Sequence, residues 1–77
     1  MLVAEYDAMM AAKGTPKVWV VSSGSSRYGS GMVHSQLFLT EEEAMSRYSQ
    51  IPEGYYKKVY RTWDIWGFTE RERAKRA

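Results

Sequence analysis

The chain has 77 residues, of which 44% are hydrophobic and 26% charged, and it carries a net charge of +2 and no cysteine. This length accommodates one small domain, and the composition is that of a folded protein rather than a disordered one. The lack of cysteine excludes disulfide bonds, thiolate catalysis and cysteine-ligated metal sites.

The sequence contains no apolar run that approaches the roughly 20 residues of a membrane-spanning helix. Glu5 and Asp7 interrupt the apolar stretch at the N-terminus, and no basic region precedes it, so we expect no signal peptide. Together with the lack of cysteine, this predicts a cytoplasmic protein without a membrane partner.

Positive charge is concentrated in the last quarter of the chain. Residues 1–56 hold four Lys or Arg against six Asp or Glu, whereas residues 57–77 hold seven against three. Such an asymmetry suits an acidic partner, either a nucleic acid or an acidic patch on a protein.

The N-terminal segment has the apolar spacing of a helix. Leu2, Tyr6, Met9 and Met10 recur at intervals of three and four, which predicts a helix over residues 2–13. Gly14 provides a helix stop. A helix this short needs a surface to lie on.

Two predicted strands follow, joined by a loop rich in Gly and Ser. KVWVVSS predicts the first strand over residues 17–23, and MVHSQLFL predicts the second over 32–39. The loop, GSSRYGSG, has the glycine spacing of a phosphate-binding loop, but it lacks the Lys and the hydroxyl, and no helix follows it. We therefore interpret it as a connection that presents Arg27 and Tyr28 as candidate partner contacts.

The second predicted helix begins at a capping box, Thr40-Glu41-Glu42-Glu43, and ends before Pro52-Glu53-Gly54. Consecutive glutamates on a helix point in different directions, so they do not form a metal or acid–base cluster. His34 is the single histidine, and the candidate carboxylates for a triad, Asp7 and Asp64, lie far from it in the sequence. We therefore expect no enzyme, no metal and no cofactor.

Residues 55–66, YYKKVYRTWDIW, predict a long third strand on which aromatic and basic residues alternate. A sheet covered on one side leaves part of these aromatics exposed as a binding surface. The alternative is a central strand whose aromatics belong to the core. The candidate partner-binding residues on this strand are Tyr56, Lys57, Lys58, Tyr60, Arg61 and Trp66.

These elements predict a single α+β domain in the order α-β-β-α-β-α, with a small three-stranded sheet and helices on one face. Its parts are an N-terminal helix over 2–13, a β-β-α-β core over 17–66 and a basic C-terminal tail over 69–77, either a marginal helix or a frayed end. A helix between the second and third strands suits parallel or non-neighbouring pairing of those strands.

Three segments, VWVVSS (18–23), LFLTEEEAMSRY (37–48) and YYKKVY (55–60), resemble a family of short uncharacterised proteins common in phages and prophages. That family joins a V-Y-V-V-x-S strand to an F-x-T-E-E-E-A helix start and a Tyr-rich last strand. The resemblance spans about residues 17–63 and implies a small sheet-and-helix fold in a viral accessory setting. It supplies no catalytic residues. The architecture is also similar to small phage inhibitors of host RNA polymerase and to some anti-CRISPR proteins.

From these observations we expect a non-enzymatic accessory protein that binds a host protein of the defence or transcription machinery and inhibits it by steric occlusion. One alternative is a nucleic-acid-binding module that uses Lys57, Lys58, Arg61 and the basic tail. Another is a sponge for a nucleotide signal at an oligomer interface. The sequence leaves open whether the protein forms a homo-oligomer.

Overall fold

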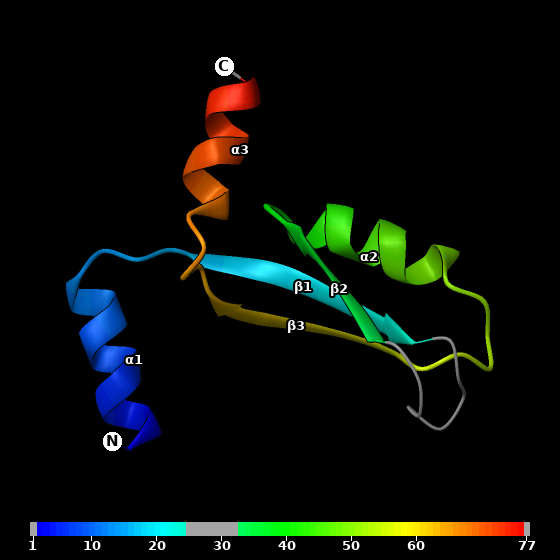
Figure 1. Ribbon diagram of the computed structural model, residues 1–77, viewed down its shortest axis with the longest axis horizontal. Helices are drawn as coiled ribbons and strands as arrows, with labels where there is room; N and C mark the ends of the chain where they lie inside the picture. Colours follow the sequence, from blue (N-terminus) through cyan, green and yellow to red (C-terminus); the bar gives the residue numbers. More distant parts are fainter. Residues whose placement is uncertain (1, 25–32, 77) are drawn as a thin grey trace.

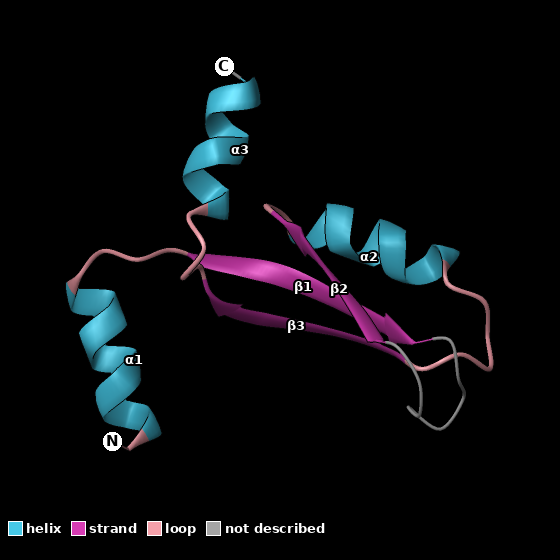
Figure 2. Ribbon diagram, in the orientation of Figure 1, coloured by secondary structure: helices cyan, strands magenta, loops and turns pink. Residues whose placement is uncertain are grey.

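The computed structural model describes residues 2–24 and 33–76, which form three helices and a three-stranded sheet (Figure 1, Figure 2). The elements are α1 (Val3–Ala12), β1 (Lys17–Gly24), β2 (Val33–Phe38), α2 (Glu41–Gln50), β3 (Lys57–Trp63) and α3 (Phe68–Arg76). The α+β class and the order α-β-β-α-β-α predicted from the sequence are confirmed. Arg27 and Tyr28 lie outside the described residues.

The central strand of the sheet is β1, in the order β2-β1-β3, and both neighbours pair with it antiparallel. The connection through α2 therefore joins two strands that are not neighbours, which was one of the two arrangements predicted. β2 and β3 run parallel to each other, because both are antiparallel to β1, but they do not pair directly as the other arrangement required. β3 runs antiparallel to β1 because α2 returns the chain along the sheet before β3 begins (Figure 1).

The core lies between the sheet and α2. Val21 of β1 is buried with Ala44 and Ile51 of α2. Four large side chains pack around this cluster: Trp19, Phe38, Tyr48 and Val59. Because side chains alternate along a strand, Phe38 and Val59 identify the face of β2 and β3 that α2 covers.

The opposite face of the sheet, called the open face below, has no described helix along it (Figure 2). Alternation places Val18, Val20 and Ser22 of β1 on this face. All three are buried, with exposed fractions of 0%, 2% and 6%. β1 is therefore buried on both faces although a helix covers only one.

We predicted that several helices cover one face of the sheet, but α2 alone of the described helices lies along it. α1 and α3 leave the same end of the sheet and extend away from it (Figure 1). α1 ends as predicted at Gly14, where φ is +73°. Its start is exposed, with Leu2 70% and Val3 78% accessible. α1 contacts the rest of the fold through Met10, which is buried, and through Asp7, which accepts a hydrogen bond from the Trp63 indole at 2.7 Å.

The capping box at α2 forms in part. The Thr40 hydroxyl accepts a hydrogen bond from the Glu43 amide at 3.2 Å, as predicted. The Glu43 carboxylate accepts two hydrogen bonds from the Arg76 guanidinium, at 3.0 and 2.8 Å, and these hold the pKa of Glu43 below its ordinary value. The segment predicted as a marginal helix or a frayed tail is therefore a helix anchored to α2.

β3 is shorter than the predicted strand over 55–66 because the chain turns at both ends. A turn closes before the strand, where the Tyr55 amide donates to the Pro52 carbonyl. After the strand, the buried Asp64 carboxylate accepts hydrogen bonds from the amides of Trp66, Phe68 and Thr69 at 3.3, 3.0 and 2.6 Å. Asp64 thus caps α3 from outside the helix and stops the strand.

The Asp64 carboxyl is held in its charged form. Burial raises its pKa, but the hydrogen bonds from Thr69, Phe68 and Trp66 outweigh burial, so the pKa lies below its ordinary value. Because folding lowers this pKa, the stabilisation is complete above the pKa of the unfolded chain and is lost as the pH falls through the folded value.

We expect Asp64→Ala to lower the free energy of unfolding by about 1–2 kcal/mol at neutral pH, because three amides lose their acceptor. Asp64→Asn keeps an acceptor and costs less. Urea unfolding followed by circular dichroism at about pH 7 and about pH 3 measures both effects. The difference in the free energy of unfolding between the wild type and Asp64→Asn should be smaller at about pH 3 than at about pH 7. An equal difference at both pH values would contradict the assignment of Asp64 as a charged cap of α3.

Candidate partner-binding surface

The six described candidates divide between the two faces of the sheet. Lys57 and Arg61 lie on the face that α2 covers, whereas Lys58 and Tyr60 lie on the open face. Tyr56 is half-buried just before β3, and its carbonyl accepts a hydrogen bond from the Gly24 amide. Trp66 follows β3 and lies on the open face, where it lines a cavity together with Val20 and Tyr60. The structure therefore brings only part of the predicted set together.

Lys57 has a structural role that the sequence analysis missed. Its ammonium lies 4.5 Å from the centre of the Tyr48 ring and donates to the Ile51 carbonyl at 3.3 Å and to Glu53 at 3.2 Å. The side chain is 13% exposed. Lys57 therefore fastens the end of α2 to β3 and is not available to a partner. The spacing of four between Glu53 and Lys57 was the signal in the sequence.

Arg61 is exposed and lies over an aromatic ring. Its guanidinium carbon is 5.4 Å from the centre of the Trp19 ring, on the neighbouring strand. This contact orients Arg61 along the sheet without removing its charge from solvent. Arg61 is thus accessible, but on the opposite side of the sheet from Tyr60 and Trp66.

The open face contains a cavity of about 280 Å³ next to the centre of β1. Two of its walls are aromatic: Tyr60, 36% exposed, and Trp66, 48% exposed. The remaining lining residues are Val20, Ser35 and Leu37. Trp66 and Tyr60 thus lie around Val20 and contribute to its burial on the side of β1 that no helix covers.

The polar groups around this cavity are few. The Ser35 hydroxyl is 2.8 Å from the Ser22 hydroxyl, so the two satisfy each other across β1 and β2. The Lys58 ammonium lies 5.1 Å from the centre of the Tyr60 ring and is exposed at the rim. The result is an apolar hollow with aromatic walls and one cation beside it. The sequence indicated Tyr60, Trp66 and Lys58, but not the contribution of Leu37 from the second strand.

The basic residues of α3 are largely engaged within the chain. Arg71 donates to the Trp66 carbonyl at 2.7 Å, and Arg76 bonds Glu43 and lies 3.6 Å from Glu72. Lys75 is 4.0 Å from Glu72. These contacts engage three of the four basic side chains of α3, so fewer of them are free to bind a phosphate backbone.

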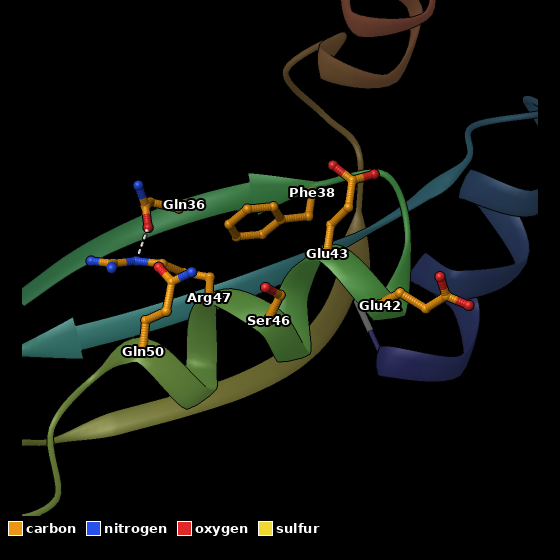
Figure 3. Close-up of a pocket in the computed structure, with 7 residues that line it drawn as sticks. All are labelled: Gln36, Phe38, Glu42, Glu43, Ser46, Arg47 and Gln50. Carbon is orange, nitrogen blue, oxygen red and sulfur yellow. Dashed lines mark hydrogen bonds between the residues drawn. The ribbon is translucent and has the colours of Figure 1, made fainter.

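A second hollow, of about 460 Å³, lies between α2 and the outer side of β2 (Figure 3). Gln36 and Phe38 come from β2, and Arg47 of α2 donates to the Gln36 side chain at 2.7 Å. Phe38 packs against the core cluster. This groove is the seam where α2 meets the sheet, and the hydrogen bond between Arg47 and Gln36 crosses it.

The described residues contain no cluster of three or more His, Asp or Glu side chains placed to hold a metal ion. Within the same residues, no helix has the length and apolar character needed to cross a bilayer.

Compared with known proteins, the chain matches no family model, no curated protein and no solved structure. The resemblance to short phage proteins stays a prediction.

The two adjacent lysines give a direct test of the division between faces. We expect Lys57→Ala to lower the free energy of unfolding by about 1 kcal/mol, because the contacts to Tyr48 and Ile51 are lost. Lys58→Ala should change it by less than about 0.5 kcal/mol. Urea unfolding measures both, and equal effects of the two substitutions would contradict the assignment of Lys57.

Proposed function

We propose that the protein is a non-enzymatic accessory protein that binds another protein through the open face of its sheet. The observation that carries this proposal is the apolar cavity walled by Tyr60 and Trp66, both of which remain partly exposed. Trp and Tyr are the residues that most often dominate binding energy when a partner buries them. Lys58 at the rim adds a contact for an acidic group on the partner.

The distribution of charge favours a protein over a nucleic acid. A nucleic-acid platform needs its aromatic and basic residues on one surface, so that stacking and phosphate contacts act together. Here Arg61 lies on the other face, and Lys57 is bound to Ile51 and Glu53. Lys58 alone of the basic residues of β3 accompanies the aromatics of the open face.

Inhibition by steric occlusion is the mode of action that we propose. A small domain that covers a functional surface of its partner blocks that surface without any chemistry of its own. The resemblance to short phage proteins supports a host protein of the defence or transcription machinery as the partner.

The test uses the intact chain as bait in a lysate of the cells that naturally encode it, followed by binding measurements with the recovered protein. We expect Trp66→Ser and Lys58→Glu each to weaken binding at least about tenfold, because both change the open face. Met45→Ser is the matched control, since it removes an exposed apolar side chain from α2.

Unfolding measurements on each variant separate lost binding from lost folding. A folded Trp66→Ser variant and a Lys58→Glu variant that both bind like the wild type would contradict the proposal, as would a bait that recovers no specific protein. Retardation of labelled RNA or DNA that weakens steeply with salt would favour the nucleic-acid alternative.

A further inference from the structure

The two outer edges of the sheet differ in charge. β3 carries two exposed basic residues, Lys58 and Arg61, and charges of this kind protect an edge strand from pairing with other chains. β2, with the sequence VHSQLF, carries no Asp, Glu, Lys, Arg or Pro. Its six residues pair with β1 in continuous register, Trp19 with Phe38 through Gly24 with Val33, so no bulge interrupts it. Of the two edges, β2 is the one suited to accept another strand.

The hydrogen bonds of β1 show which groups β2 presents outward. At the two ends of the β1–β3 ladder, Gly24 donates to Tyr56 and Asp64 donates to Pro16. Alternate residues of a strand bond to opposite sides, so even-numbered residues of β1 bond β3 and odd-numbered ones bond β2. The partners of the odd-numbered residues in β2 are His34, Gln36 and Phe38. The amides and carbonyls of Val33, Ser35 and Leu37 therefore point away from the sheet.

We propose that β2 pairs antiparallel with β2 of a second copy, which gives a symmetric dimer with one continuous sheet. Antiparallel pairing of identical strands is self-complementary about a two-fold axis, so each outward amide meets an outward carbonyl of the same strand in the partner. A strand without charge offers neither an acidic nor a basic partner an electrostatic advantage, whereas it opposes its own copy without repulsion.

The helix beside this edge is complementary to itself in the same arrangement. α2 has Glu41, Glu42 and Glu43 in its first turn and Arg47 in its last. A two-fold axis at β2 turns one α2 antiparallel to the other, which brings the acidic start of each helix towards the basic end of its partner. Among the described residues Arg47 forms no ion pair, and its side-chain partner, Gln36, is neutral.

The dimer extends beyond the proposed function and does not depend on it. Ser35 and Leu37 line the cavity of the open face and also present their backbone groups at the dimer edge. Pairing through β2 therefore places the cavities of both copies on one uninterrupted face. Such a face presents two binding hollows to a partner, which raises avidity when both are engaged.

The decisive substitution is Ser35→Pro, which removes an outward amide and leaves the ladder to β1 intact. Ser35→Ala is the matched control, because it loses the same hydroxyl bond to Ser22 but keeps the amide. Sedimentation equilibrium over a concentration series should give a mass twice that of one chain for the wild type and for Ser35→Ala. Ser35→Pro should raise the dimer dissociation constant at least about tenfold, since symmetry removes two hydrogen bonds at once.

Val33→Pro repeats the test at the first residue of β2, where proline is best tolerated, in case Ser35→Pro fails to fold. Amide hydrogen exchange of the wild type gives a further measurement that needs no substitution. Protection of the Ser35 and Leu37 amides should rise with protein concentration. A monomeric wild type across the series, a folded proline variant that dimerises normally, or a dimer with unprotected Ser35 and Leu37 amides would each overturn the proposal.

Discussion

The structure depends on the burial of β1 on both faces and along both edges. Every strand pairing in the sheet passes through β1, and its side chains alternate between the α2 core, with Val21, and the open face, with Val18 and Val20. A domain of this length has little apolar surface to bury, so it gains most from a strand that is shielded on all sides. The open face must then be closed by large side chains from β2, β3 and the following turn, and this is why Trp66 lies there.

This constraint also connects the candidate surface to stability. Trp66 lies beside Val20 and is itself half-exposed. The aromatic wall of the cavity therefore belongs to the fold and is also accessible to a partner. Lys57, in contrast, is not accessible to a partner, because its ammonium contacts the Tyr48 ring and the Ile51 carbonyl at the end of α2. Two neighbouring lysines therefore differ in role because strand alternation turns them towards different surroundings.

Much of the fold could be predicted from local patterns. The capping box located the start of α2, and Gly14 located the end of α1. The strand order could not be read locally, although the uninterrupted run VWVV in β1 was the sign of a strand buried on both faces. The end of β3 was misjudged because Asp64, which fits the alternation as a strand residue, caps α3 instead. Which face stays open depends on where α2 packs, and no single segment encodes that.

The position of β1 has a consequence for how the chain folds as it is synthesised. β1 is made early, but Lys17 pairs with Trp63, so one of its two edges stays unpaired until the last strand, β3, has been made. Before β3 is made, β1 can pair with β2 alone, so the strand that becomes central still has one unpaired edge. The closure of this long loop is the slow, entropically costly step expected of non-local pairing, and the incomplete sheet is most exposed to misassociation before it.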